Sequence, residues 1–285
     1  MGKLILFSIA GYVILVLYEF IDRMLYMSQI KIIFFDIDGT LIDMNRKKIT
    51  PKMLETLIRL KENGIKICLA SGRAPIQIPQ FEGVEFDAFL TFNGSYCYTA
   101  DEDIYSNPLS KEDVQQVIEN SMKLNRSASI ATKDFIVANS ADEELTAYFN
   151  VGGFRINVVD DFTEKVNDNT IYQMMVSGYP EEYPQMLENV AQAQITAWWN
   201  KAFDVIPKNG GKGVGVEKIL DFYGFAKEEA LAFGDGGNDI EMLQTVGTGV
   251  AMGNALDHVK AIADDVCGHV AEDGIYHYCL AKGLI

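Results

Sequence analysis

The sequence is poor in several features that mark secreted, nucleic-acid-binding and repetitive proteins. Its four cysteines are scattered and lack the close pairs of a metal site or a disulfide framework, so we expect buried thiols in a reducing compartment. It has 24 Lys and Arg against 40 Asp and Glu, a net charge of −16, and no basic block, which argues against a nucleic-acid partner. No internal repeat or low-complexity tract interrupts the 285 residues, enough for one large or two smaller α/β domains.

The sequence also lacks an apolar run of transmembrane length. Residues 4–18 are almost wholly apolar, but a spanning helix usually needs ~20 residues, and no small-residue cleavage site follows. Met27 stands just before the first predicted strand. Our preferred interpretation of residues 1–26 is therefore an upstream extension that results from a misassigned start codon. The alternatives are a signal anchor or membrane-surface helix, and a helix packed on the domain. We expect a cytoplasmic protein, with membrane contact only if this segment is genuine.

The most informative feature that is present is a pair of acids directly after an apolar run. Residues 30–35 have the pattern of a parallel strand buried on both faces, and Asp36, Asp38 and Gly39 follow it. Open α/β folds bind ligands at this carboxyl edge of the sheet. Two acids so close repel each other, which indicates a cation, a shared proton or anion-transfer chemistry. The alternative is a strand end with two solvated acids.

The pattern along the chain predicts an α/β protein with a doubly wound, Rossmann-like parallel-sheet core and an inserted α+β cap domain. Core elements are expected as strands at 65–70, 88–92, 231–233 and 249–252 and helices at 51–63, 212–223 and 276–281. The expected domains are the first half of the core at 27–94, the cap at 95–207 and the second half of the core at 208–285, with hinges at 93–95 and 207–211.

Within the insert we expect a largely antiparallel sheet. The predicted elements are a hairpin at 96–98 and 104–105, strands at 127–132, 135–138, 156–159, 171–176, 195–199 and 203–206, and helices at 110–124, after a capping box at 140–143, and at 181–193. Trp198 and Trp199 are adjacent on a predicted strand, so one should be core and the other exposed. Stacking of a sugar on the exposed ring is a hypothesis.

Four polar clusters stand at predicted strand ends or helix starts. They are Asp36 with Asp38; Ser71, Gly72 and Arg73; Lys212; and Asp235, Asn238 and Asp239. Each cluster alone has an ordinary explanation, such as a helix cap or a surface lysine. Because the carboxyl ends of parallel strands share one edge of a sheet, all four clusters can converge there.

The four motifs, in this order, resemble those of the haloacid dehalogenase superfamily of phosphatases. The large insert, together with residues 90–94 and 250–255, is similar to the Cof-type sugar-phosphatase branch of that superfamily. The resemblance covers residues 30–285. It implies a phosphoric monoester hydrolase, and the physics agrees, because a phosphate dianion can approach these acids only with a divalent cation.

The resemblance implies a Mg²⁺ site and a covalent mechanism. The metal would be held by the Asp36 carboxylate, the Asp38 main-chain carbonyl and the Asp235 carboxylate, and Asn238 and Asp239 would orient that shell or touch the phosphate. Asp36 would be the nucleophile that forms an aspartyl-phosphate, and Asp38 the general acid and base.

The remaining residues would bind the phosphate. Ser71, with backbone N–H groups such as that of Gly72, would contact a transferring oxygen, and Lys212 would neutralise charge. Arg73 could bind phosphate or pair with an acid, and Asn93 could touch substrate or form an ordinary turn. We therefore expect a Mg²⁺-dependent phosphatase of small phosphorylated metabolites, sugar phosphates first. A non-catalytic sugar-phosphate sensor on the same fold and a phosphomutase are the alternatives.

Overall fold

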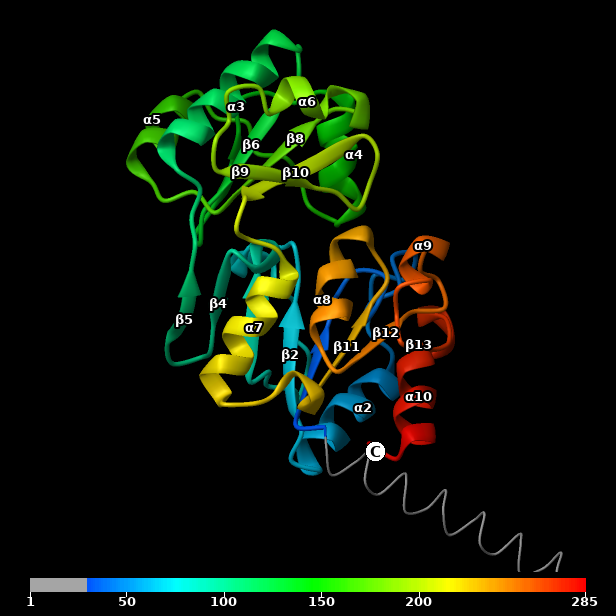
Figure 1. The fold of residues 1–285 in the computed structure, drawn as a ribbon. Coiled ribbons are helices and arrows are strands. Elements are labelled where there is room, and N and C mark those ends of the chain that lie inside the picture. The colour runs from blue at the N-terminus through cyan, green and yellow to red at the C-terminus, as the bar shows by residue number, and fades with distance from the viewer. Residues whose placement is uncertain (1–29) are drawn as a thin grey trace, which may run out of the picture.

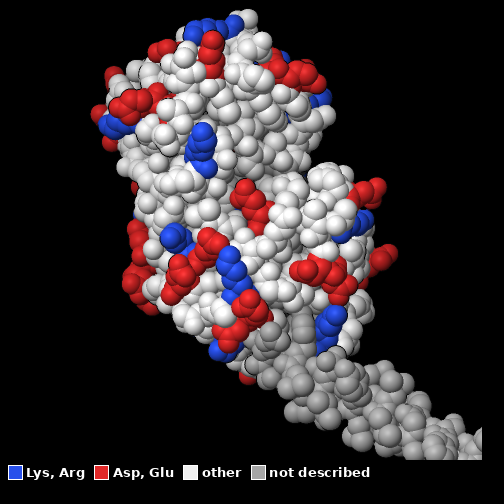
Figure 2. All heavy atoms as spheres, in the orientation of Figure 1, with Lys and Arg blue, Asp and Glu red and all other residues white. Residues whose placement is uncertain are grey.

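The computed structural model describes residues 30–285 and consists of a core and an inserted cap module (Figure 1). The apolar segment at residues 4–18 lies outside the described residues. Among residues 30–285, every helix is too short or too polar to cross a lipid bilayer. On the face drawn in Figure 2, acidic and basic side chains are interspersed rather than gathered by sign.

The core is built on an eight-stranded sheet in the order β13-β12-β11-β1-β2-β3-β4-β5. The first six strands are parallel, and β4 and β5 are antiparallel. Its strands are β1 (Ile32–Phe35), β2 (Lys66–Ala70), β3 (Ala88–Thr91), β4 (Tyr96–Tyr98), β5 (Asp103–Ser106), β11 (Ala230–Gly234), β12 (Thr248–Ala251) and β13 (Asp265–Val266). The chain leaves β1 toward β2 but returns through β11 on the other side, so β1 lies at the point where the strand order reverses.

Nine helices occur in the described residues. They are α2 (Pro51–Glu62), α3 (Lys111–Lys123), α4 (Glu143–Val151), α5 (Phe162–Asp168), α6 (Tyr183–Met186), α7 (Lys212–Tyr223), α8 (Ile240–Thr245), α9 (Asp257–Lys260) and α10 (Gly274–Lys282). Helix α2 begins as its sequence predicts: the Thr50 hydroxyl accepts a hydrogen bond from the N–H of Met53, and Pro51 is its first residue.

Strand β1 is buried on both faces because helices cover both faces of the sheet. Ile33 and Phe35 belong to the cluster that includes apolar residues of α2 and α10. Ile32 and Phe34, which point the other way, belong to the cluster that includes residues of α7 and α8. The fully apolar strand that the sequence predicted is confirmed, and its end carries Asp36 to the edge of the sheet.

The cap contains a five-stranded antiparallel sheet in the order β7-β6-β8-β10-β9. Its strands are β6 (Ala128–Ala131), β7 (Ile136–Ala138), β8 (Gln173–Ser177), β9 (Ala193–Thr196) and β10 (Ala202–Pro207). Met174, Val176, Phe203 and Val205 pack with residues of α3, α5 and α6 on one face. By alternation, Gln173, Met175 and Asp204 lie on the other face.

Two chain crossings join cap and core, and they touch at a pair of glycines. Gly94 has φ +92°, and a Cβ at that position would lie 2.1 Å from the carbonyl oxygen of Gly211. Only glycine allows backbones this close. The contact joins the two segments in which the sequence predicted hinges. The hinge function itself stays a prediction.

The predicted insert differs from the structure in several places. The hairpin of β4 and β5 pairs with β3 and so extends the core sheet, whereas we assigned it to the cap. The domain limits themselves stay a prediction. No strand forms at 156–159, where Val158 makes a single bridge to Ala138, and helix α5 was not predicted. The N-cap residue of helix α4 is Asp142, whose side chain accepts a hydrogen bond from the N–H of Leu145. The predicted capping box would have placed the N-cap at residue 140.

The helix predicted at 181–193 is reduced to α6. Asn120, on α3, donates hydrogen bonds to the carbonyls of Met186 and Glu188, and the Asp113 carboxylate accepts from the N–H groups of Ala191 and Gln192. Tertiary partners therefore replace the hydrogen bonds that would continue the helix.

The two tryptophans do not face opposite sides of a strand, because β9 ends at Thr196 before it reaches them. The Trp198 and Trp199 rings stack, with centroids 6.0 Å apart and planes 16° from parallel. Trp198 is 37% exposed.

Candidate active site

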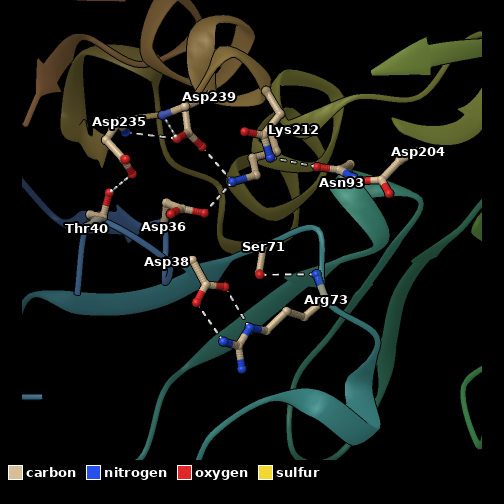
Figure 3. Close-up of polar contacts among 12 residues, drawn as sticks. Asp36, Asp38, Thr40, Ser71, Arg73, Asn93, Asp204, Lys212, Asp235 and Asp239 are labelled. Atoms are coloured by element: carbon tan, nitrogen blue, oxygen red, sulfur yellow. Dashed lines mark hydrogen bonds and ion pairs between the residues drawn. The ribbon is translucent and has the colours of Figure 1, made fainter. Parts of the chain in front are cut away.

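The centre of the site is a buried lysine between two carboxylates (Figure 3). Lys212, the first residue of α7, places its Nζ 2.6 Å from Asp36 Oδ1 and 2.5 Å from Asp239 Oδ1. Burial alone would lower the pKa of this ammonium, but Asp239 and Asp36 together raise it above its usual value. Lys212 is therefore a fixed positive charge, and the predicted surface alternative for it is wrong.

The negative charges around Asp36 exceed the single positive charge that Lys212 supplies. Burial and the nearby Asp239 raise the pKa of its carboxyl well above the ordinary value, while Lys212 lowers it. Asp235 is in the same situation, since burial and Asp239 raise its pKa to about 7. A further cation would keep both groups ionised at neutral pH.

The loop after β11 holds Asp235 against the loop after β1. Thr40 donates to Asp235 Oδ1 at 2.9 Å, and Asp239 Oδ2 accepts from the N–H groups of Asp235 and Gly236 at 3.0 and 2.9 Å. Gly39 has φ +90°, and a Cβ there would lie 2.2 Å from Asp235 Oδ2. The glycine of the first motif thus lets the acid of the last motif approach it.

Three carboxylates lie close enough to share a metal ion. Asp36, Asp235 and Asp239 each offer an oxygen, and the three oxygens lie within 4.8 Å of one another. An all-oxygen donor set of this charge suits a hard divalent cation such as Mg²⁺. Asp239 already bonds Lys212 and two N–H groups, which leaves Asp36 and Asp235 with freer oxygens. The residues present therefore fit the metal that the sequence predicted.

Asp38 and Arg73 form a bidentate ion pair. Arg73 Nε and Nη2 lie 2.7 and 2.6 Å from the two Asp38 oxygens, and Nη1 donates to the carbonyl of Gln77. Pairing with an acid, the alternative that the sequence left open for Arg73, is what the structure shows. Its three engaged nitrogens hold Asp38 in a fixed orientation.

Ser71 and Gly72 follow β2 beside this pair. Ser71 is buried, and its hydroxyl accepts from the N–H of Arg73 at 3.1 Å. Both residues line the same cavity as Asp36 and Asp38.

Asn93 does not line this cavity and instead ties cap to core. Its side chain is buried; Nδ2 donates to Gln173 and Asp204, and Oδ1 accepts from Asn238 Nδ2 at 3.0 Å. With φ +51° it also occupies the turn conformation that was its alternative. All polar atoms of its side chain bond within the protein, and its contact with substrate stays a prediction.

The clusters open into a cavity of about 390 Å³ between core and cap. Asp36, Asp38, Asp235 and Asp239 lie at its core end. The cap contributes residues that the sequence did not identify, namely Tyr148, Gln173 and Asp204. No local motif marks them, because they reach the site only through the docking of the cap.

Asp204 is the unusual group of the cap side. It accepts from the Tyr148 hydroxyl at 2.6 Å and from Asn93 Nδ2 at 3.0 Å. Burial raises the pKa of its carboxyl to about 7, although both hydrogen bonds act in the opposite direction.

Comparisons with known proteins agree with the geometry. The family model of haloacid dehalogenase-like hydrolases matches residues 33–279. The chain is 30% identical to the 5-amino-6-(5-phospho-D-ribitylamino)uracil phosphatase YitU of Bacillus subtilis, over 87% of this chain and 95% of the relative. It is 27% identical to an HMP-PP phosphatase of Escherichia coli O6:H1, over 86% and 92% of the two chains.

A solved structure described as a HAD subclass IIB sugar phosphatase is also similar. It superposes with a TM-score of 0.80 at 31% identity, over 90% of this chain and 100% of the other. The fold of this chain, with its parallel-sheet core and inserted cap, is the fold of that structure. The chain therefore belongs to the haloacid dehalogenase-like hydrolases, within their Cof-type phosphatase branch.

Proposed function

We propose that the protein is a Mg²⁺-dependent phosphatase that hydrolyses small phosphorylated metabolites through an aspartyl-phosphate on Asp36. The observation that carries the proposal is the buried Lys212 between Asp36 and Asp239, which with Asp235 line a cavity. Mg²⁺ bound by Asp36, Asp235 and the main chain at Asp38 would supply charge neutralisation for a phosphate dianion.

In the first half-reaction, an Asp36 oxygen attacks phosphorus and the bond from phosphorus to the ester oxygen breaks. Asp38 gives its proton to the leaving alcohol. Arg73 binds both Asp38 oxygens at 2.7 and 2.6 Å, which supports a role in orienting the acid. Lys212 stabilises the negative charge of the nucleophile and the phosphoryl group.

In the second half-reaction, water attacks the phosphorus of the aspartyl-phosphate. Asp38 accepts the proton of that water, and the Asp36 carboxylate and inorganic phosphate are released. Ser71 and the N–H of Gly72 would donate to the phosphoryl oxygens in both steps.

The comparisons support phosphorylated small molecules as substrates. The named relatives are phosphatases, and one solved relative is described as a sugar phosphatase, so sugar phosphates are the first class to assay. A phosphomutase needs cations for a second phosphate. Among the described residues that line the cavity, Arg73 is the single cation, and it is engaged by Asp38.

Steady-state hydrolysis of p-nitrophenyl phosphate tests the proposal. We expect turnover that needs Mg²⁺, stops with EDTA and is lost in Asp36→Asn. Asp221→Asn, which changes an exposed acid outside the site, is the control and should keep wild-type turnover. Full turnover of Asp36→Asn would overturn the nucleophile assignment, and binding of phosphorylated sugars without any turnover would favour a sensor.

A further inference from the structure

Besides the acids, the cavity is lined largely by aromatic and apolar side chains. Tyr148, Phe149, Phe154 and Trp198 come from the cap, and Met44 and Leu256 from the core. A pocket of this size and character holds an organic ligand with a few polar contacts. The lining therefore contacts the alcohol part of the substrate, since the acids bind the phosphate end.

The aromatic rings are held by one another and by the core. The Tyr148 and Trp198 ring centroids are 5.2 Å apart, and Trp198 Nε1 lies 3.4 Å from the Tyr148 hydroxyl. The Arg73 guanidinium lies over the Phe154 ring at 5.1 Å. Rings fixed in this way present flat faces with little entropy left to lose on binding, which favours stacking with a flat partner.

Most polar groups on the cap side of the cavity already have partners within the protein. Gln173 donates to the carbonyl of Gly72 and accepts from Asn93, and both oxygens of Asp204 accept hydrogen bonds within the protein. Gln77 Oε1 accepts from the N–H of Ala74. A polyol would have to bury several hydroxyls against groups that are mostly engaged, which is costly.

The charge of the lining is unfavourable for a second anionic group. Asp204 stands on the cap side, and the one cation among the described lining residues, Arg73, is paired with Asp38. A carboxylate or second phosphate on the alcohol would meet an acid without a free cation nearby.

We propose that the preferred substrates are phosphate esters of alcohols that carry a flat aromatic or heteroaromatic ring and no second anionic group. This inference rests on the proposed phosphatase function and names the substrate class of the same site, placing ring-bearing esters ahead of the sugar phosphates that the solved relative suggests. Trp198 and Tyr148 stack on the ring, and the acids at the core end act on the phosphate.

Two matched phosphates separate ring shape from leaving-group chemistry. Benzyl phosphate and cyclohexylmethyl phosphate release primary alcohols with six-membered rings, one flat and one puckered. We expect kcat/KM to favour benzyl phosphate by about tenfold, as for a stacked ring in a fitted pocket. At pH 8, where Asp204 is ionised, we expect 4-carboxybenzyl phosphate to be hydrolysed at least about tenfold less efficiently than benzyl phosphate, because its anion would lie on the side of Asp204.

Variants locate the preference. In Trp198→Leu the ratio of kcat/KM between benzyl and cyclohexylmethyl phosphate should fall toward one. Phe222→Leu removes an aromatic side chain that is 41% exposed on α7 and outside the cavity, so the ratio should stay at the wild-type value. Loss of the ratio in both variants would contradict the assignment to Trp198.

The outcomes distinguish this inference from the proposed function. Equal kcat/KM for the flat and puckered rings, or efficient hydrolysis of the carboxybenzyl ester, would overturn the substrate class and leave the phosphatase intact. Absence of turnover of p-nitrophenyl phosphate and all three esters would overturn both.

Discussion

At the scale of single residues, the proposed chemistry depends most on Lys212. Its side chain is fully buried and contacts both Asp36 and Asp239. Removing one member of such a group leaves buried charges without compensation, which costs far more than the loss of a surface ion pair.

Lys212→Met should therefore lower both activity and stability. We expect a loss of roughly 3 kcal/mol in the free energy of unfolding at neutral pH, measured by urea denaturation, and at least about a hundredfold loss in kcat. Lys218→Met, a half-buried position on the same helix, is the control. Equal effects of the two substitutions would contradict the account.

Asp204 predicts a pH dependence of stability. An acid whose pKa rises from 3.8 to about 7 on folding binds its proton more tightly in the folded state. The free energy of unfolding therefore falls as pH rises across that interval and levels off above it. In Asp204→Asn this contribution is absent.

Urea denaturation of wild type and Asp204→Asn between pH 4 and 8 measures the difference. The stability of wild type should decline more steeply with pH than that of the variant, and Asp134→Asn, an exposed acid of the cap, should follow wild type. Parallel curves for wild type and Asp204→Asn would show that Asp204 does not titrate as described.

The residues of the core end could be identified from the sequence, but those of the cap end could not. Asp36, Asp235 and Lys212 stand in motifs at strand ends and helix starts, so the sheet edge alone predicts that they meet. Tyr148 and Asp204 stand in ordinary cap elements, and only the packing of the cap against the core brings them to the cavity. Arg73 was left with two possible partners, because a sequence does not show which anion is nearer.

At the scale of elements, the crossing of the two connecting segments is the most constrained backbone feature. Gly94 combines φ +92° with a Cβ position 2.1 Å from the Gly211 carbonyl oxygen. Gly64 has φ +79° but open space around its Cβ position. Comparing Gly94 with Gly64 therefore separates the cost of the left-handed backbone conformation from the cost of steric overlap.

Gly94→Ala should destabilise the protein more than Gly64→Ala. The second substitution should cost about 1 to 2 kcal/mol from the left-handed conformation alone. The first should add the cost of moving the two segments apart and should also lower kcat/KM, because the cap is displaced from the site. Similar unfolding free energies and activities for the two variants would argue against a tight crossing.

The core elements were predictable because each has its own local cause. Strand β1 is apolar on both faces, and α2 has its cap at Thr50 and its terminating Gly64. The elements of the cap were less predictable from the sequence. Asn120 and Asp113 of α3, for example, end the helix that local sequence favours after Tyr183. The hairpin of β4 and β5 was found, but its sheet was not, since pairing partners distant in sequence leave no local pattern.

At the scale of the whole molecule, charge balance links metal binding to stability. The site gathers Asp36, Asp235 and Asp239 around one lysine in a protein of net charge −16. Ligand carboxyls must be ionised to bind a metal, and the pKa of Asp235 is raised to about 7. Binding should therefore strengthen as pH rises through 7.

Mg²⁺ should raise the thermal unfolding midpoint of the wild-type protein. At a fixed Mg²⁺ concentration of about 100 times the Kd at pH 8, the free energy of unfolding should rise by about 2.7 kcal/mol at pH 8 and by less at pH 6, where Kd is larger. Asp235→Asn should lose this gain, whereas Asp221→Asn should keep it. An identical midpoint with and without Mg²⁺ in wild type, measured by differential scanning fluorimetry, would contradict the metal site.

The central claim is that Asp36 accepts the phosphoryl group, and chemical trapping tests it most directly. Asp38→Asn lacks the base for the second step, so the intermediate should accumulate. After acid quench of this variant with p-nitrophenyl phosphate and Mg²⁺, we expect peptide mapping by mass spectrometry to place one phosphoryl group on Asp36. Release of inorganic phosphate by the wild type, with no phosphoryl group on Asp36 in either protein at any quench time, would contradict the account.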